Sequence, residues 1–250
     1  SITVKNNIIS GMSDSNSSDF TFGILSFDNP KTNAGTLSNA TVRDNKISDI
    51  GVDNSTQGVA ISLEALTGSN GNTSVDGNSI KNISTLNEGS PGTGIALRPN
   101  FGGTDSDAEV TDDNTFENVD IAVSHPEGDN VNESLTNVAT VVVNRNGGRQ
   151  RIFTPTIQNA VDAAERDGAN TNDEIEIRGR DDGGAYNERV VLNRDDDNSG
   201  RLTLTSPHNI TPEIAKSDSG GEPTIAVDRD GVTIEDLKIT RTAGGNTVAQ

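Results

Sequence analysis

The sequence predicts an all-β solenoid of short stacked strands, with one amphipathic helix near residues 156–166. Three observations lead to this fold class. A short motif recurs four times in the first half of the chain, the apolar segments are short, and turn residues (Gly, Asn, Asp and Ser) bound each segment. Short alternating or β-branched segments between such turns are typical of strands, and a repeat in the thirties is typical of solenoid coils.

The repeated motif has Val first, then Asn, and then apolar residues two and five positions after the Asn. The copies are Val4-Asn7-Ile9-Met12, Val42-Asn45-Ile47-Ile50, Val75-Asn78-Ile80-Ile83 and Val110-Asn114-Phe116-Val119, the last with one extra residue before its Asn. A second apolar segment follows each copy, at residues 22–27, 58–66, 92–99 and 119–126. We expect the apolar positions of the motif to form stacks inside the solenoid.

This pattern resembles the right-handed parallel β-helix of the pectate-lyase-like superfamily. The resemblance implies three short strands in each coil and a turn Asn that stacks on the Asn of the next coil. Asn tolerates left-handed backbone, and stacked amides can hydrogen-bond along a ladder. We therefore expect Asn7, Asn45, Asn78 and Asn114 to form a structural ladder and not a ligand site.

The second half predicts one helix and a further set of strands. Thr156 is a suitable N-cap and Gly168 a suitable stop for this helix. Its apolar face consists of Ile157, Ala160, Val161 and Ala164. Strands are predicted at residues 138–143, 174–179, 185–194, 201–206, 223–228 and 231–241.

The order of segments in this half is distinctive: "TIQNAVDAA", "DEIEIRG", "GAYNERVVL" and "GVTIEDLKIT". It resembles the start of pectinesterase-like and periplasmic copper-binding-like β-helices. In those families an amphipathic helix caps the solenoid and a strand of the form G-x-Y-x-E-x-V follows. The resemblance implies a fold and no particular activity.

The two halves therefore stand in an unusual order. We expect later solenoid coils in residues 1–125, a polar linker in residues 126–137 and the capped beginning of a solenoid in residues 138–250. The final segment also continues into the first one, with Asp236 near the position of the ladder Asn. Val232, Ile234, Leu237 and Ile239 match the repeat in kind. Such a chain is one period of a tandem array, a subunit that stacks head to tail on the next, or a fragment of a larger surface protein.

The chain is strongly acidic, with 38 Asp and Glu against 19 Lys and Arg and a net charge of -19. This charge repels phosphates and argues against a nucleic-acid partner. A dense carboxylate surface is typical of adaptation to high salt, so we expect a halophilic, haloarchaeal-type surface protein; the alternative is an ordinary acidic secreted protein. There is no Cys for disulfides and no apolar run long enough for a membrane span.

Catalysis is not expected from this sequence. Aromatic residues make up 3% of the chain, with Tyr186 the only tyrosine, so sugar-stacking platforms are nearly lacking. His125 and His208 each adjoin a proline and fit no catalytic triad or metal cluster. Arg43 and Arg98 are the only arginines of residues 1–125, where a pectinesterase-like site would have to lie.

Calcium is the one cofactor that the sequence suggests. Asp195, Asp197 and Ser199 form a D-x-D-x-S arrangement that resembles the first half of an EF-hand loop. The resemblance fails at the twelfth position, which is Ser206 and not Glu. The alternative is that these residues are surface carboxylates of a halophilic protein. Weaker candidates are Asp181 with Asp182 and Asp112 with Asp113.

Several asparagines lie in Asn-x-Ser/Thr sequons, which an extracellular protein can glycosylate. The candidate acceptors are Asn16, Asn39, Asn54, Asn72, Asn132 and Asn209. Asn82 also lies in a sequon, but it falls inside a coil and is less suited.

The expected role is structural: a cell-surface, extracellular unit of a filament, fibre or envelope array whose β-helix ends stack. The expected partners are other copies of the chain, end to end, and surface glycans. The alternative is a glycan-binding or glycan-cleaving β-helix, including a piece of a viral tail fibre.

Overall fold

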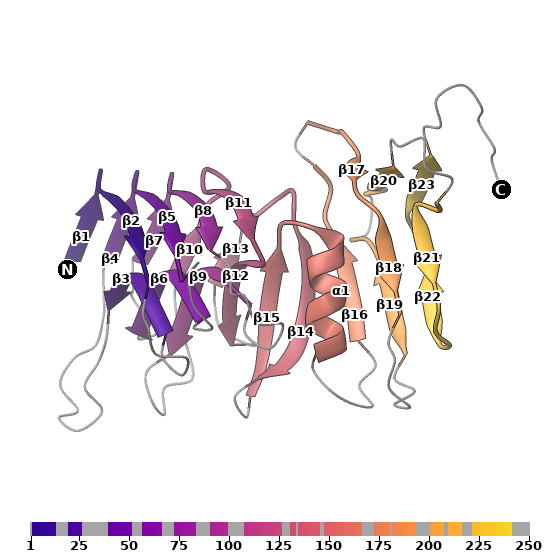
Figure 1. Ribbon diagram of the computed structural model, residues 1–250, viewed down its shortest axis with the longest axis horizontal. Coiled ribbons are helices and arrows are strands. Elements are labelled where there is room, and N and C mark those ends of the chain that lie inside the picture. The colour runs from indigo at the N-terminus through magenta and orange to yellow at the C-terminus, as the bar shows by residue number, and fades with distance from the viewer. Residues whose placement is uncertain are drawn as a thin grey trace. The chain divides into compact units, whose positions relative to one another are not determined.

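The computed structural model describes residues 2–13, 20–26, 40–51, 57–66, 73–83, 91–99, 108–126, 131–133, 135–145, 148–166, 173–180, 182–193, 201–207, 210–216 and 222–241 (Figure 1). The chain divides into two compact units, each described here by itself. Unit 1 comprises residues 1–135 with 150–152, and unit 2 comprises residues 136–149 with 153–250.

Unit 1 is a parallel β-solenoid of four coils with three strands in each coil. The first strands are β1 (Ile2–Lys5), β4 (Ala40–Arg43), β7 (Thr73–Asp76) and β10 (Ala108–Val110). The second strands are β2 (Ile8–Met12), β5 (Lys46–Ile50), β8 (Ser79–Ile83) and β11 (Thr115–Val119). The third strands are β3 (Phe20–Ser26), β6 (Gln57–Leu66), β9 (Thr93–Pro99) and β12 (Ile121–Pro126). The predicted fold class is confirmed.

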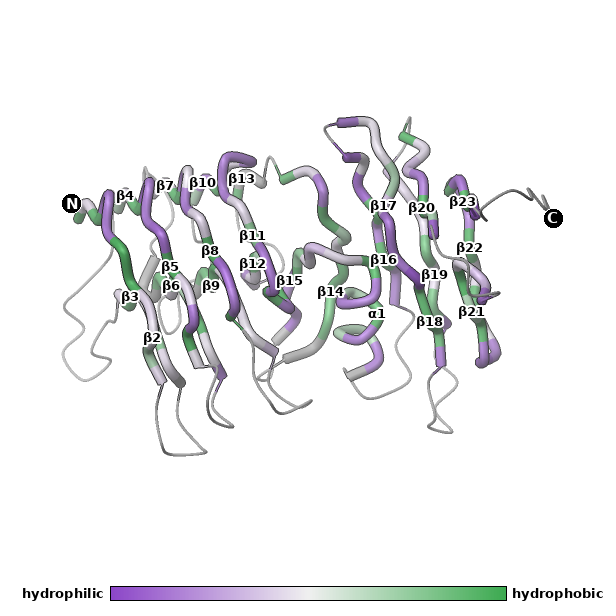
Figure 2. The backbone as a smooth tube through the Cα atoms, turned by 45° about the horizontal axis from the view of Figure 1, so that its top comes forward, coloured by the Kyte–Doolittle hydropathy of each residue, from purple (hydrophilic) through white to green (hydrophobic). Residues whose placement is uncertain are grey.

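The register of unit 1 places equivalent residues of the motif on top of one another. Val4 pairs with Val42, which pairs with Val75 in the next coil. The apolar positions after the Asn stack in the same way, from Ile9 to Ile47 and from Met12 to Ile50. Because side chains alternate between the two faces of a strand, this register turns one row inward in every coil. Figure 2 shows the resulting alternation of hydrophobic and hydrophilic residues along the strands.

The interval expected to be a linker contains a strand. β13 (Val131–Glu133) pairs in parallel with β10 and adds a fifth strand to the sheet β1–β4–β7–β10. The linker expectation for residues 126–137 rested on a polar composition. Composition missed this strand because the pairing here is made by backbone groups, which polar residues supply equally well.

Unit 2 begins with a different arrangement of strands. β14 (Ala139–Arg145) pairs antiparallel with β16 (Asp173–Ile177), whereas β16, β19 (Leu202–Thr205) and β22 (Val232–Ile234) pair in parallel. Two smaller sheets complete the unit. They consist of β17 (Tyr186–Asn187), β20 (Glu213–Lys216) and β23 (Lys238–Arg241), and of β18 (Val190–Leu192) and β21 (Ile225–Val227). β15 (Gly148–Thr154) follows β14, and the division between the units passes through it.

The predicted helix is α1 (Ile157–Arg166), which packs against β14, β16 and β18. Its apolar face is buried, as expected from the spacing of Ile157, Ala160 and Val161. Thr156 is its N-cap, because the Asn159 backbone N–H donates to Thr156 Oγ1 at 3.1 Å. In the described part of the chain no helix is both long and apolar enough to cross a membrane.

The predicted strand over residues 185–194 is split into β17 and β18 at Glu188 and Arg189. The structure also adds β15 and β20, which the sequence pattern did not reveal because each has only two adjacent apolar residues beside charged ones. These differences concentrate in unit 2, where no repeat guides the assignment.

Candidate functional site: the asparagine ladder and the open coils

The four motif asparagines form one continuous ladder across the coils of unit 1. Asn7 Nδ2 donates to Asn45 Oδ1 at 3.0 Å, and Asn45 Nδ2 donates to Asn78 Oδ1 at 2.9 Å. Asn78 Nδ2 in turn donates to Asn114 Oδ1 at 3.0 Å. Each Oδ1 also accepts the backbone N–H of the preceding Asn, at 3.0 to 3.1 Å.

The amides of Asn45, Asn78 and Asn114 also reach back to the coil before them. Asn45 Nδ2 donates to the Val4 carbonyl oxygen at 3.1 Å, and Asn78 Nδ2 donates to that of Val42 at 2.9 Å. Asn45 and Asn78 are both fully buried, so these bonds satisfy polar groups that water cannot reach. The ladder therefore acts as a structural spine that fixes the register between neighbouring coils.

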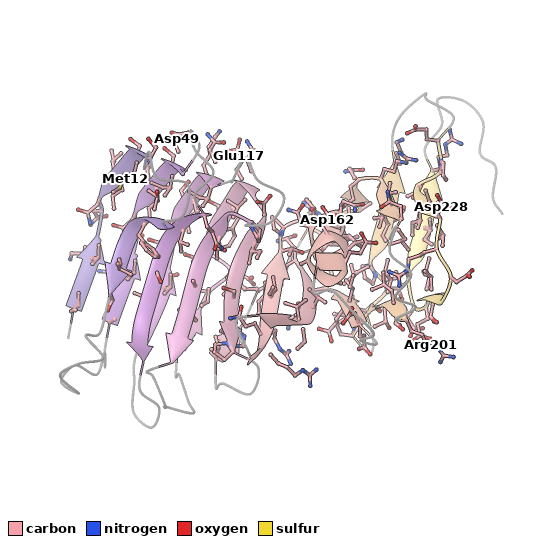
Figure 3. The ribbon with its side chains drawn as sticks, turned by 60° about the horizontal axis from the view of Figure 1, so that its bottom comes forward. Met12, Asp49, Glu117, Asp162, Arg201 and Asp228 are labelled. Carbon is pink, nitrogen blue, oxygen red and sulfur yellow. The ribbon has the colours of Figure 1, made fainter. Side chains whose placement is uncertain are left out.

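A second row of side chains runs along the outside of the same unit. Asn118 Nδ2 donates to Asn82 Oδ1 at 3.0 Å, and Asn82 Nδ2 donates to Asp49 Oδ1 at 2.8 Å. All three residues have positive φ, as does Gly11 at the equivalent place in the first coil. The hydrogen bonds from Asn82 and Ser48 lower the pKa of Asp49. Figure 3 shows Met12, Asp49 and Glu117 along this side of the unit.

The first coil of unit 1 exposes residues that the other coils bury. Ile2 is 51% exposed and Met12 is 40% exposed, whereas their register partners Ala40 and Ile50 are 2% and 0% exposed. Val4 and Ile9 are half-buried at positions that are buried in the second and third coils. We call Ile2, Val4, Ile9 and Met12 the leading edge; among the described residues, these side chains have one coil beside them instead of two.

The ladder is also incomplete at the leading edge. The Oδ1 atoms of the other three ladder residues (Asn45, Asn78 and Asn114) each accept two hydrogen bonds from the coil before. Asn7 Oδ1 is the equivalent atom of the first coil. No donor among the described residues reaches Asn7 Oδ1. Asn7 is exposed, as are Ile2 and Met12 of the same coil.

The last coil of unit 2 likewise exposes apolar residues whose register partners are buried. Val227 is 50% exposed and Ile239 is 46% exposed, although their register partners Leu192 and Ile214 are both 0% exposed. Val232 and Ile234 are half-buried, while their partners Leu202 and Leu204 are buried. We call Val227, Val232, Ile234 and Ile239 the trailing edge.

We call the turn between the first and second strands of a coil its corner. The corner between β22 and β23 in the last coil has the same backbone conformation as the corner between β1 and β2 in the first coil. The ladder position in the last coil, however, falls one residue later than the sequence alignment placed it. Asp236 has a φ of 58°, and so has Asn6, which precedes the ladder residue. Leu237 therefore occupies the ladder position, and Asp236 does not. No acceptor among the described residues takes the Leu237 backbone N–H. Sequence comparison alone missed this shift because φ is a property of the folded backbone.

Neighbouring coils pair opposite charges at directly opposed positions. Lys81 Nζ lies 2.7 Å from Glu117 Oε1, and these two residues are register partners. The same holds for Lys238 and Glu213, at 2.7 Å. The hydrogen bond from Lys238 lowers the pKa of Glu213, with Thr240 adding to the effect. Within the described part of the chain, Lys5 and Glu235 form no ion pair.

Side chain and backbone contacts within unit 2 hold the N-terminus of α1. Glu188 accepts the backbone N–H groups of Ile157 at 2.9 Å and Gln158 at 3.0 Å, the first two residues of the helix. The Gln158 side chain bonds to both the N–H and the carbonyl of Val191, at 2.7 and 3.2 Å. Burial raises the pKa of Glu188, partly offset by the two backbone hydrogen bonds.

The G-x-Y-x-E-x-V strand of unit 2 therefore has a structural explanation. The Tyr186 hydroxyl lies 2.6 Å from the Arg178 carbonyl oxygen and its ring is buried, so the ring offers no platform for a sugar.

His125 is buried at 3% exposure, with Nδ1 2.8 Å from the Pro126 carbonyl oxygen. Among the described residues, no group of three or more His, Asp or Glu side chains is placed to hold a metal ion.

Most of the predicted ligand and glycan positions lie outside the described residues. These are Asp195, Asp197 and Ser199 of the calcium prediction and the sequon residues Asn16, Asn39, Asn54, Asn72 and Asn209. Asn132 falls in β13. Asn82, less suited on sequence grounds, uses its amide in the outer row of hydrogen bonds.

Comparison of the chain with known proteins gave no match to a family, to a curated protein or to a solved structure.

Proposed function

We propose that this protein is a structural unit of an extracellular surface filament or array, and that its β-solenoid coils stack end to end on further copies of the chain. The single observation that carries the proposal is the exposure of inward-facing apolar residues at two edges. Buried register partners show that these positions belong to a core. Covering them removes apolar surface from water, which stabilises an assembly in proportion to the area covered.

The backbone supports the same proposal. A parallel coil without a neighbour leaves a row of N–H and C=O groups unpaired, and such edges are templates for strand addition. A contact between two different edges is heterologous, so it generates an open chain of subunits unless the rotation closes a ring. The contact is the same whether the copies are separate subunits or tandem repeats of one polypeptide.

The acidic surface suits an assembly in concentrated salt. A net charge of -19 makes copies of the chain repel one another at low ionic strength. In about 1 M salt the screening length falls to roughly 3 Å, and the repulsion between distant charges is removed. We therefore expect association to strengthen with salt while the apolar contact is retained.

The test is to purify residues 1–250 and measure their association by sedimentation velocity at rising protein and salt concentrations, with electron microscopy of the products. We expect linear oligomers with an axial repeat. Monodisperse single particles at every concentration and salt would refute the proposal. Met12→Asp, which puts a charge on the leading edge, should reduce association, whereas Ser48→Asp on the second coil should not.

A further inference from the structure

The corners of the first and last coils define how two copies would meet. We infer that β22–β23 of one copy stacks in parallel on β1–β2 of a second copy, with Asp236 beside Asn6 and Glu235 beside Lys5. This inference rests on the proposed function and specifies its contact. The alignment follows from the matching left-handed residues, which have the same φ of 58° and lie two residues before β2 and β23, respectively.

In this register the two edges bring apolar residues of the same kind together. Ile234 lies over Val4 and Ile239 lies over Ile9, as Val4 and Ile9 lie over Val42 and Ile47 within unit 1. Val232 lies over Ile2, whose side chain is 51% exposed. A shift by one residue would turn every inward side chain outward, so the pattern of burial permits this register and excludes its neighbours.

The polar groups left over at the two edges also complement each other. Along the ladder, each Oδ1 accepts the backbone N–H of the ladder residue one coil earlier. In the stacked pair that residue is Leu237 of one copy, and the acceptor is Asn7 Oδ1 of the other. Both groups lack a partner among the described residues of a single chain.

The charges of Lys5 on one copy and Glu235 on the other favour the same register between the two copies. Lys5 is the register partner of Arg43, so one face of Lys5 already has a like charge beside it. Glu235 would lie on its other face, in the relationship that Lys81 has to Glu117 and Lys238 has to Glu213. Opposite charges at directly opposed positions stabilise strand pairing, and like charges destabilise it.

The first test exchanges these two charges. Lys5→Glu and Glu235→Lys should each weaken association, by about tenfold at roughly 0.15 M salt, because like charges then face each other. The double variant should recover to within about threefold of the unaltered chain. Lys46→Glu on the second coil and Glu174→Lys on β16 are the matched controls, and neither should change association.

The second test uses the absence of cysteine from the chain. Thr3 and Thr233 are exposed residues that become direct neighbours in the proposed register. Neighbouring parallel strands bring Cα atoms into the range that a disulfide spans. A chain carrying Thr3→Cys and Thr233→Cys should therefore form covalent multimers under mild oxidation. A chain carrying Thr3→Cys with Thr203→Cys should not, because Thr203 pairs with Thr233 inside its own unit.

The outcomes separate this inference from the function on which it rests. Association that ignores both the charge exchange and the cysteine pair would overturn the register and leave end-to-end assembly standing. Failure of the unaltered chain to associate under any condition would overturn the proposed function, and the register would fall with it.

Discussion

Units 1 and 2 hold their coils together by different means. In unit 1 a ladder of side-chain amides crosses all four coils, with Asn45 and Asn78 fully buried in it. In unit 2 the equivalent corner carries Leu237, and single contacts replace the ladder: the Tyr186 hydroxyl on the Arg178 carbonyl, the Glu188 carboxylate on the helix N-terminus and Ser206 Oγ on the Asp236 carbonyl at 3.1 Å.

The difference shows what sequence each kind of contact, the amide ladder and the helix with its single hydrogen bonds, requires. A ladder needs the same residue at the same corner of every coil, because each amide is both donor and acceptor for its neighbours. A cap needs one well-placed helix and no repetition. Unit 1 can therefore add coils without changing its chemistry, whereas each contact of unit 2 serves one position.

The largest expected effect breaks the ladder of unit 1. Asn78→Ala leaves the buried N–H of Asn45 without its acceptor and the Val42 carbonyl without the amide donor. Each orphaned buried group costs about 1–3 kcal/mol, so we expect a loss of roughly 2–5 kcal/mol. Hydrogen exchange followed by mass spectrometry should show faster exchange in residues 40–50 and 73–83, with unit 2 unchanged.

The control for this variant is Asn118→Gly in the outer row. Asn118 is exposed and has a φ of 53°, which glycine adopts without strain. We expect a change within about 0.5 kcal/mol. Equal effects of the two variants would mean that the buried ladder has no special role in unit 1.

A smaller effect compares the packing at two glycines. A Cβ at Gly58 would collide with the carbonyl oxygen of Ile50 in the coil wall of unit 1. A Cβ at Gly183 in unit 2 would meet no atom within 4 Å, although its φ of 64° disfavours other residues. We expect Gly58→Ala to cost about 1–3 kcal/mol or more and Gly183→Ala about 1 kcal/mol. Denaturant unfolding of the two variants measures the difference, and a larger cost at Gly183 would contradict it.

The smallest effect concerns the cap of unit 2 and its pH dependence. Burial raises the pKa of Glu188, so the folded chain holds this proton more tightly than the unfolded chain does. The resulting stabilisation is present below the ordinary glutamate pKa and is lost as the pH rises through the raised value. Glu188→Gln should remove this dependence, because the amide does not titrate.

Thermal unfolding at several pH values measures the effect. The midpoint of the unaltered chain should fall from this cause as the pH rises above the ordinary glutamate pKa of 4.5, and the slope should be smaller in Glu188→Gln. Glu174→Gln, at an exposed site on β16, should keep the original slope. An unchanged slope in Glu188→Gln would show that Glu188 does not titrate in the measured pH range.

Much of unit 1 could be predicted because one motif repeats. The positions of Val42, Asn45 and Ile47 relative to those of the next copy fix the strand, the corner and the inward row together. The helix of unit 2 was also predictable, since the spacing of Ile157, Ala160 and Val161 defines a helical face. β13 and β20 were not, because neither carries a continuous apolar pattern.

The sequence by itself determined the solenoid, its repeat, the ladder positions of unit 1 and the helix α1, since each follows from local periodicity. Only the tertiary structure decided the corner of the last coil, where the left-handed residue is Asp236 and the ladder position falls on Leu237. Backbone φ and exposure depend on neighbouring coils, and a residue pattern does not record them. For the same reason, only the folded chain distinguishes Ile2, which is 51% exposed, from Ala40, its buried partner one coil away.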